Sequence, residues 1–427
     1  MRVSRQVAVF VGAIALVMVS LLAGGTAIAK SDASDAPNVS FTRASLGAGV
    51  RDGVALSGTS LVLAGSGLAT AIYTDPFGHP PITYESGTWT GAWTDTPFAY
   101  DELIASWNAV TPANTWVKIE MEGQGSGRVT KRYVLGIWAS GDLDIHRTSV
   151  PAQGDGDGFV AIDTFVRSKK ALPLDAYRLR VTLYRRAGSS ATPTLRGVAA
   201  MVSAAPKGYA IPSAHTGVVR TLPVPEYSQE THIGHFPEYD NGGEAWCSPT
   251  STAMVLAFWR TGPDAAALAA FPGNDPGTST PHADGQVDHA ARYVYDWNYN
   301  GAGNWPFNTA HATTYGLDGF VTRLRSLAEA ERFIRAGIPL IASINGKLPG
   351  FFFGSTNGHL LVISGFDANG DVISNDPAVM TNDEVQKTYA RADFESVWLE
   401  GSGGIVYVIR PFTVPLPENV PGLPNNW

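Results

Sequence analysis

The sequence predicts two folded domains, an all-β sandwich followed by an α+β domain. Short strand patterns separated by turn residues fill residues 41–204, whereas helical patterns and then buried strands fill residues 224–411. Gly (46 residues) and Pro (28) are frequent and only 16% of the residues are charged, which is typical of a protein rich in strands and loops. A chain of 427 residues can form a substantial core in each domain.

Four runs of residues define strands in the first domain: Ser60–Ala64, Trp116–Met121, Tyr133–Trp138 and Tyr177–Tyr184. The second and the last run alternate apolar and polar residues, as strands with one solvent-facing side do. Clusters of Asn, Gly, Ser and Asp separate the runs at intervals typical of a sandwich. We therefore expect a jelly-roll-like sandwich over residues 41–204.

The second domain begins with helical patterns. An apolar run over residues 252–259 predicts a buried helix, with Ser248 as its N-cap and Pro249 in its first turn. Later patterns predict helices at 264–270, 285–297 and 326–335 and strands at 338–344, 359–367 and 372–374. Helices followed by strands are the order of an α+β fold.

The N-terminus has the pattern of an export signal. Arg2 and Arg5 precede an apolar stretch over residues 7–22, and Ala27-Ile28-Ala29 fits a cleavage site. We expect residues 1–29 to be a signal peptide, although a membrane anchor would share part of this pattern. No second stretch is long and apolar enough to span a membrane, so the sequence predicts a secreted, extracellular or cell-wall-associated protein.

Three segments are expected to lie outside the two domains. They are a flexible lead over residues 30–40, a linker over residues 205–223 and an extended Pro-rich tail over residues 412–427.

Charge and aromatic content limit the partners. A net charge of -8 argues against nucleic acid and against an anionic membrane surface. Aromatic residues of the first domain could stack on cell-wall or other polysaccharide, although sandwich cores also use such side chains. These residues are Trp89, Trp93, Tyr100, Trp107, Trp116 and Trp138.

Cys247 is the only cysteine of the chain, so no intramolecular disulfide can form. It lies at the start of the predicted buried helix, where the partial positive charge of the helix N-terminus favours thiolate over thiol. A thiolate in this position is an activated nucleophile if a histidine is near. A lone cysteine can equally be a small, buried apolar residue.

His359 stands at the beginning of an apolar strand, and Asp376 follows the next strand. Cys, then His, then Asp is the order of thiol hydrolase sites in which the acid orients the imidazole. Asn375 could orient His359 in place of Asp376. A regular hairpin that turns at Asn369–Gly370 would place Asp376 opposite Ile363, so a bulge or a departure of the chain must bring the acid to His359.

Four stretches of the second domain resemble the double-glycine (bacteriocin-leader-processing) peptidases, family thirty-nine of the cysteine peptidases, and above all their secreted stand-alone relatives. The stretches are Val224–Gln229, Trp246–Ser251, Gly358–Asp367 and Asn375–Pro377. The resemblance extends from Val224 to about Pro411 and implies a papain-like α+β fold and a bacterial thiol protease.

The resemblance also implies roles for single residues. Cys247, His359 and Asp376 would form the catalytic triad, and Gln229 would help to form the oxyanion hole. Ser248 departs from the family, which often has Gly after the nucleophile, and the segment between Gln229 and Cys247 is unusually long. Leader-peptide processing is not implied, because that activity belongs to enzymes fused to transporters.

Other chemistries have less support. His232, His235, Asp240, His282, His289 and His311 could in principle bind zinc. The pair His232-x-x-His235 lacks the Glu and the helix of a metalloprotease site, and the chain has no cysteine pair, so we expect no metal and no other cofactor. A Gly-rich phosphate loop after a strand and a Gly-x-Ser-x-Gly motif are both absent from the sequence.

Together the patterns predict a secreted cysteine peptidase that hydrolyses peptide or protein substrates through a thioester intermediate. One alternative is a cell-wall peptide amidase or transpeptidase with the same triad. Another is a non-enzymatic surface-binding protein with a vestigial triad. Because every proposed catalytic residue follows the linker, residues 224–411 are expected to be active without the sandwich.

Overall fold

A computed structural model describes residues 38–204, 212–269 and 283–427. The expected signal peptide over residues 1–29 and most of the expected lead lie outside the described residues. Strands outnumber helices in the described residues, which form two sheets in the first half and one sheet with helices in the second. None of the helices described is long and apolar enough to cross a membrane.

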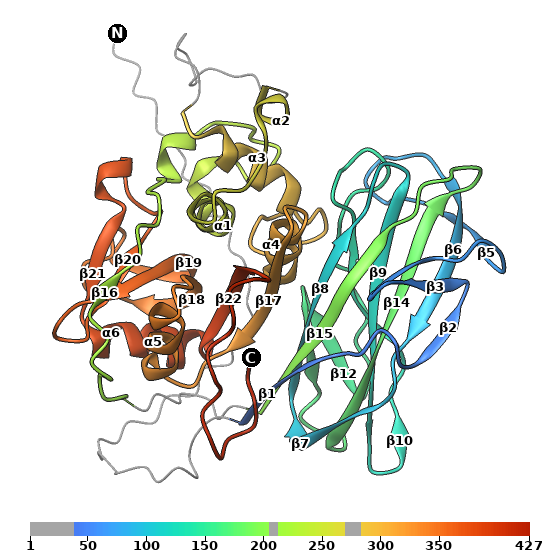
Figure 1. Cartoon of the computed structure of the whole chain (residues 1–427), viewed down its shortest axis with the longest axis horizontal. Helices are drawn as coiled ribbons and strands as arrows, with labels where there is room; N and C mark the ends of the chain where they lie inside the picture. The colour runs from blue at the N-terminus through green and yellow to red at the C-terminus, as the bar shows by residue number, and fades with distance from the viewer. Residues whose placement is uncertain (1–37, 205–211, 270–282) are drawn as a thin grey trace, which may run out of the picture. The chain divides into compact units, whose positions relative to one another are not determined.

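The first half consists of two antiparallel sheets (Figure 1). Side chains of the two sheets share one core, which includes Trp107 of β8 and Val181 of β14. The first sheet has the order β12 (Gly158–Ala161), β13 (Thr164–Arg167), β8 (Glu102–Val110), β15 (Thr194–Ala204), β4 (Ser60–Leu63) and β3 (Val54–Ser57), with β1 (Asn38–Arg43) on β15. The second has the order β10 (Arg128–Val129), β9 (Thr115–Gly125), β14 (Leu174–Arg186), β6 (Ile82–Thr90) and β2 (Val50–Asp52), with β11 (Tyr133–Trp138) on β9, β5 (Ala69–Tyr73) on β6 and β7 (Thr94–Tyr100) on β14.

Strand β1 begins at Asn38, which pairs with Ala204 of β15. Residues 38–40, expected as the end of a flexible lead, are therefore part of the sheet. Of the six aromatic residues considered for a stacking platform, five are at most 2% exposed and belong to the interior. Those five are Trp89, Tyr100, Trp107, Trp116 and Trp138. Trp93 is half-buried beneath the guanidinium of Arg178, 4.7 Å from its ring centre.

The second half contains a single sheet with a buried helix packed on it. The sheet has the order β17 (Leu317–Arg323), β22 (Ile405–Pro411), β18 (Leu340–Lys347), β19 (Ser355–Phe366), β20 (Val372–Asn375) and β21 (Gln386–Tyr389), with β16 (Arg220–Thr221) on β19. The helices are α1 (Cys247–Phe258), α2 (Ala265–Ala269), α3 (Gly285–Val294), α4 (Trp305–Thr313), α5 (Leu327–Arg335) and α6 (Arg391–Glu395), and α6 continues into the π-helical turn η5 (Ser396–Glu400). Three short 3₁₀ turns complete it: η2 (Glu230–His232), η3 (Gly243–Ala245) and η4 (Asn382–Glu384).

Helix α1 begins earlier than its apolar run predicts. Cys247 is its first residue and Trp246 its N-cap, so the expectation that Ser248 caps this helix is wrong. Ser248 instead lies inside the first turn, where its hydroxyl forms a 2.9 Å hydrogen bond with the hydroxyl of Tyr407. A fully buried serine needs such a partner, and the sheet supplies one.

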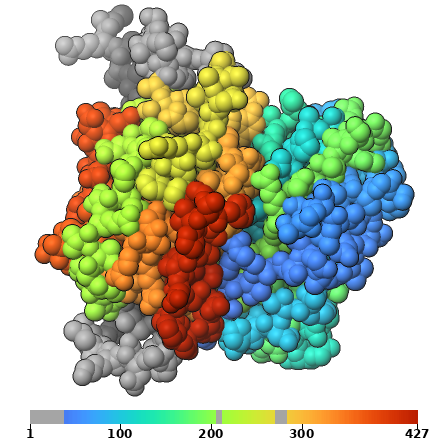
Figure 2. All heavy atoms as spheres, viewed as in Figure 1, coloured from blue at the N-terminus to red at the C-terminus, as the bar shows by residue number. Residues whose placement is uncertain are grey.

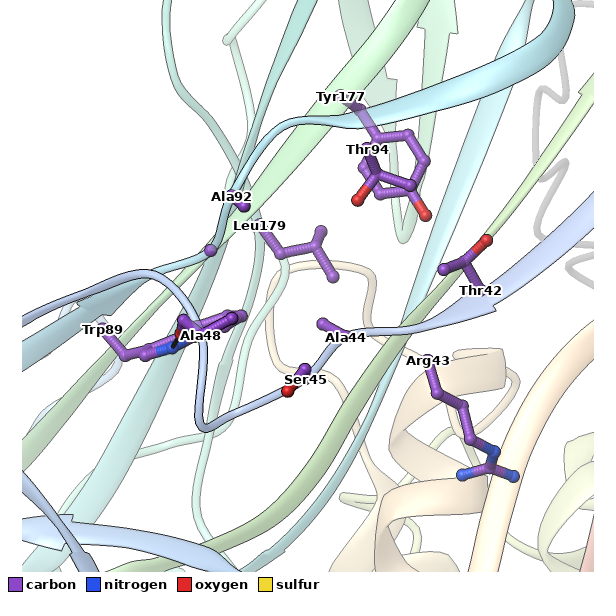
Figure 3. Close-up of a pocket in the computed structure, with 11 residues that line it drawn as sticks. Thr42, Arg43, Ala44, Ser45, Ala48, Trp89, Ala92, Thr94, Tyr177 and Leu179 are labelled. Carbon is purple, nitrogen blue, oxygen red and sulfur yellow. Dashed lines mark hydrogen bonds between the residues drawn. The ribbon is translucent and has the colours of Figure 1, made fainter.

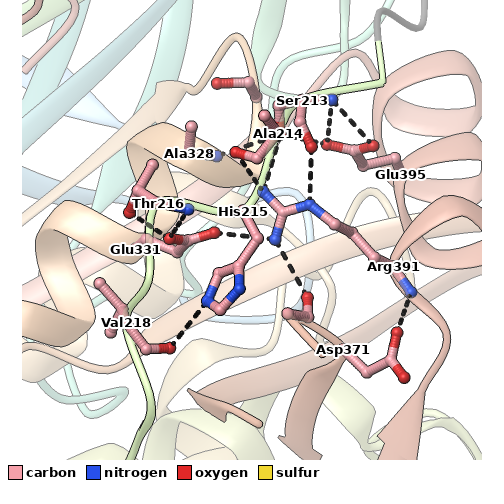
Figure 4. A network of polar contacts seen from close by, with 12 residues as sticks. Ser213, Ala214, His215, Thr216, Val218, Ala328, Glu331, Asp371, Arg391 and Glu395 are labelled. Carbon is pink, nitrogen blue, oxygen red and sulfur yellow. Dashed lines mark hydrogen bonds and ion pairs between the residues drawn. The ribbon is translucent and has the colours of Figure 1, made fainter. Parts of the chain in front are cut away.

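The end of the expected linker is fixed to the second half. The side chain of Arg391 donates to the carbonyl of Ser213 (2.8 Å) and forms an ion pair with Glu331 (2.8 Å). Glu331 also accepts from the backbone N–H of Thr216, and Glu395 accepts from the hydroxyl of Ser213. Figure 4 shows the guanidinium of Arg391 bound to Ser213 and Glu331, with Glu395 bound in turn to Ser213 and Thr216 to Glu331. Residues 213–221 are therefore packed against the second half, and the segment at 205–211 lies outside the described residues.

The Pro-rich tail lacks helices and strands, but its end is buried. The indole of Trp427 packs on Phe333 with ring centres 5.0 Å apart, and the amide of Asn426 donates to the carbonyl of Arg323 (2.8 Å). In the space-filling view the C-terminal residues form a dark red band on the surface (Figure 2). The buried indole and amide explain why a segment without secondary structure has one defined course.

Side chains of the two halves pack in common cores and form ion pairs and hydrogen bonds with one another. Phe307 of α4 belongs to the sandwich core, where its ring meets Trp107 at 6.0 Å. Asp318 of β17 is 1% exposed and accepts from Arg43 of β1 (2.8 Å) and from Asn108 of β8 (2.8 Å). A buried carboxylate needs such partners, because leaving it unpaired would be strongly destabilising. The sandwich is thus part of the structure that supports the second half.

We expect Phe307→Ala to lower the free energy of unfolding by about 3–5 kcal/mol, because it opens a cavity in a core that both halves share. Phe412→Ala is the matched control: its ring is 56% exposed, so the expected change is within about 0.5 kcal/mol. Urea unfolding of both variants measures the difference. Equal stabilities would contradict the shared core. For the same reason we now expect a chain that starts at Pro212 to be less stable and less active than the sequence alone suggested.

Candidate active site

Cys247 lies at the N-terminus of α1, half-buried. No side chain among the described residues caps this helix, and its first turn carries no acidic residue. The free N–H groups of the first turn therefore face a site where they can stabilise a negative charge on the sulfur or on a reacting oxygen. The hydroxyl of Ser251 donates to the carbonyl of Leu360 in β19 (3.2 Å), which fixes the helix against the strand that carries His359.

His359 connects the sulfur to a carboxylate. Its Nε2 lies 2.7 Å from Oδ1 of Asp376, and the charge of Cys247 acts on the same ring. Because Nε2 carries the proton given to Asp376, Nδ1 is the nitrogen that can exchange a proton with the thiol. Burial lowers the pKa of His359, but the charges of Asp376 and Cys247 outweigh burial and raise this pKa to about 10.

The contact between His359 and Asp376 depends on a bulge. Phe366 pairs with Val372 at the end of the hairpin, and this register would place Asp376 opposite Val362, on the other face from His359. One extra residue, Ser364, shifts the register between Ile363 and Gly365. Asn375 then pairs with Val362, so Asp376 follows opposite Leu361 and shares the face of His359. This bulge is the irregularity that the sequence required.

Gly365 adjoins the bulge for a steric reason. A Cβ on this residue would lie 2.3 Å from the carbonyl oxygen of Arg220, because β16 pairs with β19 at this position. Only a residue without a side chain fits there, so the shape of the hairpin is fixed by Ser364 and Gly365 together.

Asp376 is held by more than His359. The hydroxyl of Tyr389 donates to its Oδ2 (2.6 Å), and the backbone N–H of Ala378 donates to Oδ1 (3.0 Å). Burial raises the pKa of Asp376, but His359 and these two donors outweigh it, and the net effect lowers the pKa. The carboxylate is therefore ionised. The sequence contains no signal that marks Tyr389 as its partner.

Asn375 does not contact His359. Its amide donates to the carbonyls of Val224 (3.0 Å) and Pro225 (3.2 Å), and successive residues of a strand point to opposite faces. Asn375 thus anchors the start of the second half, and of the two candidates only Asp376 lies where it can orient the imidazole.

Gln229 lies at the start of η2 and is 3% exposed. Its amide nitrogen donates to the carbonyl of Glu244 (2.8 Å) and to Oε1 of Glu230 (3.0 Å). Both of its N–H groups are therefore used within the chain, and a reacting oxygen would have to replace one of these acceptors. Burial raises the pKa of Glu230, as does the charge of Glu244, while Gln229 and His359 lower it. The sequence indicated Gln229 but not the carboxylate that holds it.

Two groups of residues could hold a metal ion among the described residues. In the first, Nδ1 of His232 and Nδ1 of His235 lie 3.1 and 3.0 Å from different oxygens of Asp288, and all three residues are buried. One carboxylate that accepts a hydrogen bond from each imidazole accounts for these distances without an ion. The second group is Asp75, His79 and His146 in the first half. Sequence reasoning considered His232 and His235 but missed Asp288; His282 lies outside the described residues.

The first half contains a small pocket of about 130 Å³ lined by Trp89, Tyr177, Leu179, Thr94 and Arg43. Figure 3 shows Trp89 and Tyr177 on opposite sides of it. Pockets for drug-sized ligands occupy about 300–1,000 Å³, so this one is too small for such a molecule.

Comparisons with known proteins find family models for both halves of the chain. Residues 38–203 match the family model of the peptidase C39 N-terminal domain, and residues 221–405 match that of the peptidase C39-like family. A solved structure of a candidate C39-like peptidase from Bacillus anthracis is 18% identical, with a TM-score of 0.29, and the match covers 45% of this chain and 97% of that chain. A structure of infectious bursal disease virus, Gt strain, is 12% identical, with a TM-score of 0.20, and the match covers 43% of this chain and 37% of that one.

Both structural likenesses are too weak to carry an argument, and no protein of curated function matches the chain. The assignment rests instead on the two family models, which together match residues 38–203 and 221–405. Membership in this family suggests cysteine peptidase activity. Residues 221–405 form a domain of the C39-like peptidase family, and residues 38–203 form the N-terminal domain that accompanies such peptidases.

Proposed function

We propose that the protein is a secreted cysteine peptidase in which Cys247, His359 and Asp376 form the catalytic triad. The observation that carries the proposal is the buried 2.7 Å contact between His359 and Asp376. Cys247, whose charge acts on the same imidazole, lies at a helix N-terminus. A papain-like arrangement of the second half and a jelly-roll-like sandwich in the first are part of the proposal. Secretion is supported by the sequence pattern of residues 1–29.

In the proposed reaction, Nδ1 of His359 takes the proton of Cys247 and the sulfur attacks the carbonyl carbon of a peptide bond. The tetrahedral intermediate collapses, the C–N bond breaks, and imidazolium gives its proton to the leaving amine. Water then attacks the thioester while His359 takes a proton from it, and the C–S bond breaks to release a carboxylic acid. Asp376 keeps the imidazole oriented and stabilises its charged form.

The developing oxyanion would accept hydrogen bonds from the backbone N–H of Cys247 and from the amide of Gln229. The amide must first leave Glu230 or the carbonyl of Glu244. A buried Glu230 competes with the oxyanion for this donor, so substrate binding has to displace one internal hydrogen bond.

The same groups could transfer the acyl group to an amine, as in a cell-wall transpeptidase, or cleave a cell-wall peptide. Release of peptides from purified cell wall, compared with release from casein, distinguishes these activities from general proteolysis. Contact with cell wall through the first half remains a separate proposal, and a pull-down of full-length protein by cell wall tests it.

We expect Cys247→Ala and His359→Ala each to lower turnover by at least about 10⁴-fold without loss of structure, because each removes a group that makes or breaks a bond. Asp376→Asn should cause a smaller loss, since an amide oxygen can still accept from Nε2. Digestion of an unbiased peptide library, together with circular dichroism, measures both effects. Wild-type turnover by Cys247→Ala would exclude this nucleophile.

We expect the stabilising effect of the pair formed by His359 and Asp376 to depend on pH. The raised pKa of His359, about 10 against an ordinary 6.5, contributes stability fully below pH 6.5 and loses it as pH rises to about 10. The lowered pKa of Asp376 contributes above its ordinary value of about 3.9 and loses it as pH falls. Wild type should therefore exceed Asp376→Asn in unfolding free energy most clearly between about pH 4 and 6.5. A difference that is constant up to pH 10 would contradict the pairing.

We expect Tyr389→Phe to move the acidic limb of the pH–activity profile to higher pH, because the carboxylate of Asp376 loses a charge-assisted donor worth about 1.5–3 kcal/mol. Tyr84→Phe, which removes a buried hydroxyl bound to a carbonyl in the first half, is the control and should leave the profile unchanged. If Tyr389→Phe lowered activity equally at all pH values, the hydroxyl would act on folding and not on Asp376.

A further inference from the structure

Three consecutive phenylalanines follow β18 in a compact loop over Leu348–Gly354. The backbone N–H of Phe351 donates to the carbonyl of Leu348 (3.1 Å), and that of Gly354 donates to the carbonyl of Phe351 (2.9 Å). The N–H of Leu348 closes the loop on the carbonyl of Gly354 (3.2 Å). Gly354 has a φ of 75°, which favours glycine at this turn. The loop therefore holds its side chains in place before any ligand arrives.

The rings of this loop lead from the catalytic imidazole to the surface. Phe351 is 6% exposed and its ring centre lies 5.1 Å from that of His359. The ring of Phe353 lies 6.0 Å from that of Phe351, and the ring of Phe352 lies 4.9 Å from that of Phe353. We call Phe351, Phe352 and Phe353 the aromatic ladder. Aromatic pairs at these separations are in contact, so the ladder is continuous.

The outer part of the ladder is not used by the core. Phe352 is 50% exposed and Phe353 is 57% exposed, although covering such a side chain is worth about 1.5–3 kcal/mol. A single exposed phenylalanine needs no explanation, but two adjacent ones joined to a catalytic histidine by a third ring form an apolar surface at the site. Because Phe351 joins this surface to His359, a substrate bound at the proposed site would cover Phe352 and Phe353.

We propose that the aromatic ladder is a specificity subsite that binds a large apolar side chain of the substrate peptide. This inference rests on the proposed peptidase function and adds the class of substrate. His359 has to give its proton to the leaving amine, so the imidazole lies toward the leaving side of the scissile bond. The ladder packs on that imidazole, and it therefore contacts the first or second residue that follows the cleaved bond.

The test compares wild type with the double variant Phe352→Ser and Phe353→Ser, and Phe412→Ser is the control because its ring is equally exposed (56%) but lies on the C-terminal segment. Mass spectrometry of a peptide-library digest gives the cleavage profile. We expect wild type and the control to favour Phe, Tyr, Leu or Met after the cleaved bond. In the double variant, kcat/KM should fall roughly 10–200-fold for such peptides and little for peptides with Ser there.

Alkylation of Cys247 by iodoacetamide should proceed at the same rate in all three proteins, since the ladder is not proposed to activate the thiol. A flat cleavage profile in wild type would overturn the proposal, as would equal losses for apolar and polar peptides or a slower alkylation in the double variant. Binding of wild type, but not of the double variant, to phosphatidylglycerol vesicles with no change in cleavage would assign the rings to a membrane surface and also overturn it.

A peptide-binding experiment distinguishes failure of the subsite from failure of the proposed peptidase function. The variant Cys247→Ala, with and without the two ladder substitutions, is titrated with the same peptides, and neither protein needs to cleave them. Tighter binding of apolar peptides that disappears with the ladder substitutions supports the subsite even if wild type hydrolyses nothing. Equal affinities for apolar and polar peptides would overturn the subsite even if wild type is an active peptidase.

Discussion

The register of one hairpin determines whether Asp376 can pair with His359. A strand exposes alternate residues on opposite faces, so a shift of a single residue decides whether Asp376 faces His359 or points away from it. Ser364 supplies the shift, and the neighbouring Gly365 allows β16 to pass close enough to hold it. The pairing of the imidazole with Asp376 and the raised pKa of His359 both depend on this arrangement.

The remaining parts of the site are held by the interior of the protein and not by its surface. Helix α1 is buried along most of its length, and hydrogen bonds from Ser248 and Ser251 attach it to the sheet. Tyr389 fixes the far side of the carboxylate. Cys247 on a buried helix and His359 on a central strand are therefore held by the same packed interior, and the proposed catalysis by an activated thiol would require such preorganisation.

Sequence reasoning identified the residues of the proposed triad but not those that hold them. The order of Cys247, His359 and Asp376 is visible in the chain, and the need for a bulge follows from counting residues in the hairpin. Tyr389 and Asp288 could not be found, because their contacts are made by tertiary packing that leaves no pattern in the sequence. Ser248 was misassigned as a cap for a related reason: a hydroxyl from a distant strand, on Tyr407, competes with the local role.

Because the ring of Phe307 lies in the sandwich core, the two halves cannot be exchanged independently. Domains that meet only through a linker can be exchanged between relatives, whereas here each half completes the interior of the other. A chimera that joins this second half to an unrelated first half would lose the contact of Phe307 with Trp107 and the donors that Arg43 and Asn108 supply to Asp318. A substitution at Phe307 or Asp318 therefore changes the interior of both halves at once.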